Sequence, residues 1–283
     1  VIPRYRALSE GGQVELSMTP YAHPMVPLLI DFKSAREAMP DVALPESDCY
    51  PGGEARSRWH IEYGLETFQR YFGVRPRGCW PAEGGVSDAC VSLLGDYDFD
   101  WLATGESVLR NSLARCEKHQ HGPVEEKLHT AYKIKGQGPH CFFRDDGLSD
   151  LIGFTYADWH ADDAVANMVV NLENIAKKCV DKPNAIVSII LDGENAWEYY
   201  PQNGFHFLKA LYEKLSQHKK FRLTTYSDYL EICTEKKTLT DIFAGSWVYC
   251  SFSTWIGETD KTRAWDALVE SKHVYEKLIQ SKK

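Results

Sequence analysis

The stretch Ala185-Ile186-Val187-Ser188-Ile189-Ile190-Leu191-Asp192-Gly193-Glu194-Asn195-Ala196-Trp197-Glu198 carries most of the information about the fold of this 283-residue chain. Its first seven residues are apolar with one polar interruption, which predicts a strand buried on both faces, as in a parallel sheet. Asp192 and Gly193 follow this strand directly. Because active sites of α/β barrels are built at the ends of such strands, Asp192 is a candidate catalytic residue.

A second segment, Arg77-Gly78-Cys79-Trp80-Pro81-Ala82-Glu83-Gly84-Gly85, has the same design. It places the carboxylate of Glu83 where a short apolar stretch gives way to glycine. Carboxylate pairs cleave glycosidic bonds, and flat aromatic faces pack against pyranose rings. Two acids beside Trp80 and Trp197 therefore indicate acid-assisted chemistry on a sugar.

The rest of the chain alternates between strand and helix patterns. Apolar runs and alternation predict strands over residues 12–19, 76–82, 99–104, 184–191 and 221–225, and apolar spacing with caps predicts helices over residues 54–72, 88–94, 162–179, 203–215 and 262–279. A polar loop is expected before residue 12, and a short apolar piece at residues 140–144. This alternation, with long insertions at strand ends, favours a parallel α/β barrel over a β-sandwich.

Composition excludes several classes of protein. The net charge of −8, without a long basic cluster, argues against a nucleic-acid partner. No apolar run reaches the roughly 18 residues that suggest a membrane span, and we expect a cytoplasmic protein. The eight cysteines contain no C-x-x-C pair, so we expect reduced, structural thiols and no zinc knuckle.

Four segments together resemble four of the five sequence regions of glycoside hydrolase family 57. These segments are residues 12–16 (Gly-Gln-Val-Glu-Leu), 80–83 (Trp-Pro-Ala-Glu), 191–197 (Leu-Asp-Gly-Glu-Asn-Ala-Trp) and, in a divergent form, 245–257. The resemblance implies an α/β fold, an incomplete (β/α)7 barrel with helical insertions. On that basis we expect the catalytic barrel to occupy residues 1–257 and a C-terminal helical segment to occupy residues 258–283.

The resemblance also implies site residues and a substrate. Glu83 would be the nucleophile and Asp192 the general acid/base of a retaining enzyme that acts on α-glucans, with neither cofactor nor metal ion. Glu194 is the rival of Asp192, because both lie on the same turn. Trp80 and Trp197 are expected to contact the sugar.

Further residues have both a functional and a structural interpretation. Candidates for substrate contact are His23, Arg144, Asp150, Trp247 and Trp255. A loop histidine without a role is as good an explanation of His23, and a structural ion-pair cluster is the commoner explanation of Arg144 and Asp150. Core packing explains the two tryptophans equally well.

One departure from the family pattern leaves other functions open. The family's first region, a His-Gln-Pro stretch, is absent, and His119-Gln120-His121 has the wrong context; we expect this region and its strand to precede Val1. An inactive glucan-binding fragment is therefore an alternative function. A metal-dependent deacetylase or mannosidase ranks lower, because none of the ten histidines forms a His-x-x-x-His pair. The linkage, the balance of hydrolysis and transglycosylation, and the oligomeric state stay open.

Overall fold

The predicted helices form where the sequence places their caps. The long helix α3 (Gly53–Phe72) ends at Gly73, whose φ of 75° is a left-handed stop that glycine adopts without strain. The Ser87 hydroxyl accepts a hydrogen bond from the Cys90 amide, 3.2 Å away, and so caps α4 (Asp88–Gly95). The helices predicted over residues 162–179, 203–215 and 262–279 are also confirmed, as α7, α9 and α11.

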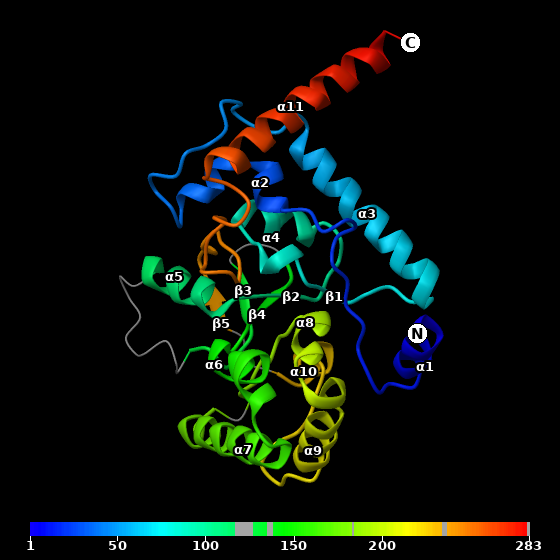
Figure 1. Cartoon of the computed structure of the whole chain (residues 1–283), viewed down its shortest axis with the longest axis vertical. Helices are drawn as coiled ribbons and strands as arrows, with labels where there is room; N and C mark the ends of the chain where they lie inside the picture. Colours follow the sequence, from blue (N-terminus) through cyan, green and yellow to red (C-terminus); the bar gives the residue numbers. More distant parts are fainter. Residues whose placement is uncertain (117–126, 135–137, 183, 234–236, 282–283) are drawn as a thin grey trace. The chain divides into compact units, whose positions relative to one another are not determined.

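The computed structural model (Figure 1) describes residues 1–116, 127–134, 138–182, 184–233 and 237–281. The helices are α1 (Ile2–Glu10), α2 (Val26–Ile30), α3, α4, α5 (Glu106–Cys116), α6 (Asp146–Asp150), α7 (Ala161–Lys178), α8 (Gly193–Glu198), α9 (Phe205–Ser216), α10 (Tyr226–Ile232) and α11 (Thr259–Gln280). Shorter helical turns are η1 (Phe32–Arg36), η2 (Ala82–Gly84), η4 (Leu151–Thr155), η5 (Tyr156–Asp158) and η6 (Pro201–Gly204). The strands are β1 (Gly78–Cys79), β2 (Trp101–Thr104), β3 (Tyr132–Ile134), β4 (His140–Phe143) and β5 (Lys237–Leu239).

The five strands form one sheet in the order β1-β2-β4-β3-β5. β1 and β2 are parallel, with Gly78 opposite Trp101. A side chain at Gly78 would lie 2.0 Å from the Trp101 indole, so only glycine fits beneath that ring. β3 and β4 are antiparallel, which corrects the expectation of parallel strands throughout.

Three predicted strands are wrong as regular elements. The segment 12–19 pairs only through an isolated parallel bridge between Met18 and Cys79. Residues 221–225 have no regular structure. The segment 184–191 is not a strand either, although the Ile186 amide donates to the His129 carbonyl and the Asp145 amide donates to the Ser188 carbonyl. An apolar run predicts that a segment is buried. A regular strand also needs a neighbouring strand with which it can form several consecutive backbone hydrogen bonds.

The chain begins with helix α1 where a polar loop was expected. None of its residues is buried, so it lacks the apolar stripe on which helix prediction depends. Proline in its first turn and the Arg6–Glu10 ion pair, with a nitrogen-to-oxygen distance of 2.9 Å, are its local helix signals.

The structure consists of two compact units. The first comprises Val1–Gln120, Tyr132–Phe142 and Thr238–Lys283, and the second comprises His121–Ala131 and Phe143–Lys237. In the first unit, α2 packs against α3, and its buried residues Leu28 and Leu29 join Phe252 and Ile256 in a core. In the second unit, α7 packs against α9 (Figure 1), and both helices contribute to a separate core. The proposed barrel boundary at residue 257 stays a prediction.

Candidate functional site

Glu83 lies on a strained turn directly after β1. Its φ and ψ of 55° and 25° are left-handed, a conformation that costs a non-glycine residue about 1–3 kcal/mol. The Gly84 amide closes the turn on the Pro81 carbonyl at 2.8 Å, and the Glu83 carbonyl accepts from the Trp247 amide at 3.1 Å. Backbone strain that neighbouring contacts hold in place is common at functional sites.

Both oxygens of the Glu83 carboxylate have partners. His23 Nε2 lies 2.8 Å from Oε1, and the indole N–H of Trp247 donates to Oε2 at 3.1 Å. An ionised carboxylate can accept at both oxygens at once. The side chain is 29% exposed, so its carboxylate is fixed in direction and still reachable from solvent.

His23 reaches Glu83 from a second strained turn. Ala22 and His23 have φ values of 59° and 56°, and the His23 amide donates to the Pro20 carbonyl at 3.1 Å. Inside the same unit, His60 Nδ1 lies 2.7 Å from the carbonyl of Tyr21 and so fixes the start of this turn. These backbone contacts therefore hold the His23 side chain next to the Glu83 carboxylate.

Trp80 and Trp247 form the aromatic part of the same cluster. Their rings lie edge to face with centroids 5.2 Å apart. The backbone turn at Gly84 allows this approach, since a side chain there would come within 2.9 Å of the Trp80 ring. We call Glu83, His23, Trp80 and Trp247 the Glu83 cluster.

Trp255 does not belong to the Glu83 cluster. It packs against the core of the first unit, and its carbonyl accepts the indole N–H of Trp265 at 3.0 Å. The predicted pair of tryptophans from residues 245–257 is thus divided between Trp247, which contacts Glu83, and Trp255, which supports α11.

Asp192 lies in the second unit as the residue that precedes α8. It has extended backbone angles (φ −69°, ψ 123°), is half-buried, and its side chain makes no capping hydrogen bond to that helix. Glu194 follows within α8, and its side chain lies outside the described residues.

Trp197 packs into the core of the second unit. Its ring lies 5.4 Å from that of Tyr200 and 6.4 Å from that of Phe207. Gly204 makes room for it, since a side chain there would come within 2.7 Å of the indole. These contacts favour a structural role for Trp197 over the predicted sugar contact.

Arg144 holds the segment that leads to Asp192. Its Nε donates to the carbonyl of Ile190 at 2.9 Å, and its two terminal nitrogens pair with Asp146 at 2.8 Å and with Asp150 at 2.6 Å. The Arg144 side chain is 9% exposed, whereas that of Asp150 is 54% exposed. The predicted polar residues therefore form an ion-pair cluster that ties the backbone two residues before Asp192.

The sequence interpretation missed a buried pair in the second unit. His129 Nε2 lies 3.0 Å from Asp145 Oδ2, and the other carboxylate oxygen of Asp145 caps α6 by accepting from the Leu148 amide at 2.9 Å. His129 stands alone in a weakly patterned segment, so no spacing signal connects it with Asp145. Asp145 has a structural explanation in this pair.

Six of the cysteines that the structure describes are buried thiols. Seven of the eight are free: Cys49, Cys79, Cys90, Cys141, Cys179, Cys233 and Cys250. Burial raises the pKa of Cys90 to about 12 and that of the Cys79 thiol well above its ordinary value, so both stay protonated near neutral pH. Within the described residues, no three or more His, Cys, Asp or Glu side chains are grouped so that they could hold a metal ion.

Comparison with known proteins decides the family. The model of glycosyl hydrolase family 57 matches residues 1–242. This chain belongs to glycosyl hydrolase family 57. None of the curated proteins compared with it matches significantly.

Several solved structures share the fold of this chain, among them one described as a family 57 enzyme. A branching enzyme from Thermococcus kodakaraensis matches 94% of this chain with a TM-score of 0.71 at 16% identity, and 55% of its own chain is covered. The α-amylase AmyC of Thermotoga maritima matches 87% of this chain with a TM-score of 0.63 at 15% identity, with 54% of its own chain covered. A 4-α-glucanotransferase from Thermococcus litoralis matches 87% with a TM-score of 0.60 at 18% identity, with 32% covered. The expected α/β fold, an incomplete (β/α)7 barrel with helical insertions, is therefore confirmed.

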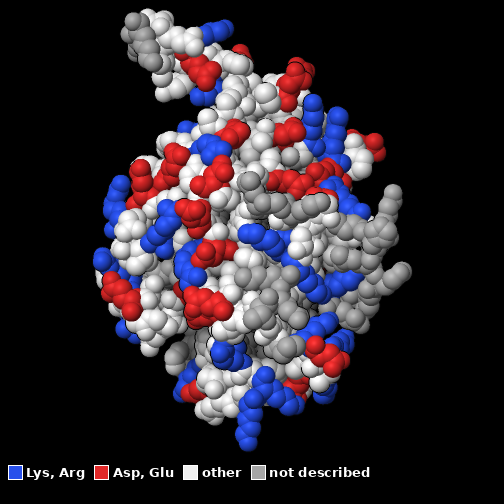
Figure 2. All heavy atoms as spheres, turned by 180° about the vertical axis from the view of Figure 1, so that it is seen from behind, with Lys and Arg blue, Asp and Glu red and all other residues white. Residues whose placement is uncertain are grey.

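The family 57 chain spans about half the length of the first two of these structures. Within its described helices, none combines the length and apolarity needed to cross a bilayer. Basic and acidic side chains are interspersed over the face drawn in Figure 2.

Proposed function

We propose that this chain is a retaining glycosidase or transglycosylase of α-glucans, with Glu83 as nucleophile and Asp192 as general acid/base. The Glu83 cluster carries the proposal, because it holds an accessible carboxylate in one direction beside aromatic rings. Family membership supports the substrate class: the similar structures are those of a branching enzyme, an α-amylase and a 4-α-glucanotransferase.

The first half-reaction uses the two carboxyl groups in different forms. An ionised Glu83 oxygen attacks the anomeric carbon, while protonated Asp192 gives its proton to the departing glycosidic oxygen. The bond from the anomeric carbon to that oxygen breaks as the Glu83 ester forms. His23 and Trp247 hold the Glu83 carboxylate so that it meets the anomeric carbon in one orientation.

The second half-reaction releases the sugar from Glu83. Asp192, now ionised, takes a proton from water or from a sugar hydroxyl, and that oxygen attacks the anomeric carbon. Water gives hydrolysis, and a sugar hydroxyl gives a new glycosidic bond. Two inversions at the anomeric carbon retain the α-configuration.

Trapping of the intermediate tests the proposal. The chain is incubated with a 5-fluoro-α-glucosyl fluoride, which forms the glycosyl ester faster than it is hydrolysed, and is then digested and analysed by mass spectrometry. We expect one added glycosyl mass on the peptide that contains Glu83, and no label in Glu83→Gln. A label on another carboxylate in a chain that turns over maltoheptaose would refute the nucleophile.

A second candidate function is glucan binding without catalysis, because the aromatic rings beside Glu83 could bind a sugar that is not cleaved. The same experiment separates the two functions. A chain that binds maltoheptaose in calorimetry but neither forms the ester nor releases sugar would be a binding protein. Loss of turnover in EDTA would instead indicate metal-dependent chemistry.

A further inference from the structure

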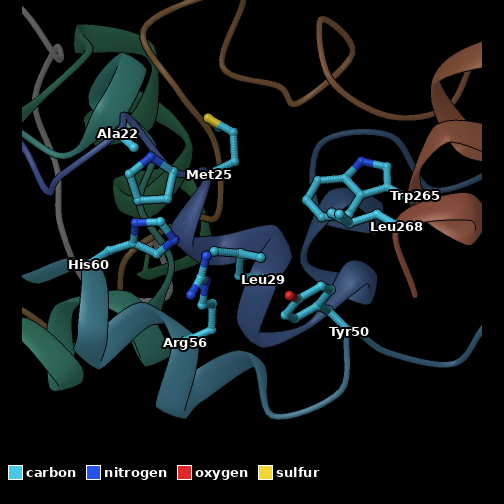
Figure 3. A pocket seen from close by; sticks show the side chains of 9 residues that line it. Ala22, Met25, Leu29, Tyr50, Arg56, His60, Trp265 and Leu268 are labelled. Atoms are coloured by element: carbon cyan, nitrogen blue, oxygen red, sulfur yellow. The ribbon is translucent and has the colours of Figure 1, made fainter. Parts of the chain in front are cut away.

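A cavity of about 220 Å³ lies in the first unit, among side chains from α2, α3, α11 and the turn that carries His23. Its walls include Met25, Leu29 and Trp265, with Arg56 and Leu268 exposed at its rim. Figure 3 shows Arg56 and His60 projecting from α3 and Trp265 and Leu268 projecting from α11. The volume is below the roughly 300–1,000 Å³ of pockets for drug-sized ligands, so it suits a single ring.

Three polar side chains line this cavity: Tyr50, Arg56, whose guanidinium also stacks on the Trp59 ring at 4.4 Å, and His60. Tyr50 lines the cavity and is 8% exposed. His60 Nδ1 bonds to the carbonyl of Tyr21, which can only accept, so Nδ1 carries the hydrogen. Burial lowers the pKa of His60, so the ring is neutral near pH 7 and its Nε2 is an acceptor.

These groups select one chemical class. Arg56 donates, His60 Nε2 accepts, and the Tyr50 hydroxyl can do both. The oxygens of a carboxylate or phosphate would be repelled by the lone pair of His60 Nε2, because both groups are acceptors. A hydrocarbon would leave the polar groups without hydrogen-bond partners. A neutral ring with several hydroxyl groups satisfies all three, and its apolar face can lie against Trp265 or Met25.

We infer that this cavity is a second sugar-binding site that takes one glucosyl ring of an α-glucan, separate from the Glu83 cluster. The choice of glucose over other neutral sugars rests on the proposed function. The side chains that line the cavity are not those of the Glu83 cluster, although the turn at residues 20–25 contributes residues to both.

Methionine methyl signals make the site measurable. The chain has four methionines, of which Met25 lines the cavity and Met168 lies in the core of the second unit. The protein is labelled with ¹³C-methyl methionine in the Glu83→Gln background, so that maltose is bound but not processed. Each signal is assigned by a Met→Leu variant. We expect maltose to shift the Met25 signal in a saturable way and to leave the Met168 signal in place.

Variants at the rim and in the wall assign that shift to the cavity. Leu268→Trp fills the cavity from the half-exposed rim, and we expect it to weaken the Met25 titration at least about tenfold, equivalent to about 1.4 kcal/mol. Ile279→Trp, on the same helix but outside the cavity, should titrate like the parent. Tyr50→Phe removes only the hydroxyl and should weaken binding about fivefold.

Three results would overturn the inference. They are a Met25 titration that Leu268→Trp and Tyr50→Phe leave unchanged, the lack of any Met25 shift at saturating maltose, and a shift caused by benzoate rather than by maltose. The proposed function fails separately. If the Glu83 ester does not form but the cavity still binds maltose, the second site stands without the catalytic assignment.

Discussion

Glu83 and Asp192 are held in different ways. Glu83 is fixed through its side chain, with one carboxylate oxygen bonded to His23 and the other to Trp247. Around Asp192 it is the backbone that is fixed, because Arg144 binds the carbonyl of Ile190 and α8 begins immediately after Asp192. A nucleophile must stay ionised and aimed at one atom, whereas a general acid/base gains and loses a proton in each cycle. The difference therefore matches the roles proposed for the two residues.

Glu83→Gln is expected to have the largest effect. The amide keeps the shape of the side chain but cannot form the glycosyl ester, so kcat should fall on the order of 10³-fold or more. Release of reducing ends from maltoheptaose measures this loss, and calorimetry should show nearly unchanged binding. Glu66→Gln, an exposed carboxylate on α3, is the matched control and should be fully active. Near-normal turnover by Glu83→Gln would remove the basis of the comparison.

Asp192→Asn should have an effect that depends on the leaving group. Loss of the acid should lower kcat about 100-fold or more for maltooligosaccharides, and much less for an activated aryl α-glucoside, whose leaving oxygen needs no proton. The kcat ratio of the two substrates is the measurement. Glu194→Gln is the parallel variant, because Glu194 lies on the same turn. If Glu194→Gln shows this dependence and Asp192→Asn does not, then Glu194 is the general acid/base in place of Asp192.

Local signals in the sequence were enough to place Glu83 and the helices α3, α4, α7, α9 and α11. Ser87 caps α4 and Gly73 ends α3, as their residue types predict. The sequence placed Glu83 where an apolar stretch gives way to glycine, and in the structure Glu83 lies on a turn directly after β1. Each of these features depends on residues within one or two turns of each other.

Contacts between distant residues could not be predicted in the same way. His23 and Trp247 both bond to Glu83, although 60 and 164 residues separate them from it in sequence. The segment 184–191 has the apolar character of a buried strand, but its backbone finds only scattered partners, and Trp197 packs into a core. The apolar composition of a segment predicts that it is buried, whereas the residues that it contacts depend on the whole fold.

Trp247→Phe sharpens the comparison by removing one of the two bonds to Glu83. Phenylalanine keeps an aromatic ring beside Trp80 but loses the N–H that donates to Oε2. We expect kcat to fall about tenfold, with KM changed less than threefold, because a bond to a charged group is worth about 1.5–3 kcal/mol and Glu83 is partly exposed. Steady-state kinetics on maltoheptaose gives both constants.

Trp255→Phe is the control for that variant. Trp255 comes from the same region of the sequence, but it packs against the core and contacts α11 through its carbonyl. We expect a lower thermal midpoint and an unchanged kcat in the folded protein. Equal losses of kcat in the two variants would show that the bond to Oε2 has no special part in positioning Glu83.

Arg144→Lys should have the smallest effect, and it tests the backbone half of the comparison. Lysine keeps the charge but cannot bond to Ile190, Asp146 and Asp150 together, since its ammonium lacks the planar fork. We expect the free energy of unfolding to fall by about 1–2 kcal/mol, which corresponds to roughly 2–8 °C in the thermal midpoint. Arg110→Lys, in an exposed pair with Glu106, should change it by less than about 0.5 kcal/mol. Below the transition, kcat should fall less than about threefold, because Arg144 holds the backbone near Asp192 rather than its carboxyl group. A large loss of kcat in a fully folded Arg144→Lys protein would mean that Arg144 acts on the chemistry itself and not only on the backbone before Asp192.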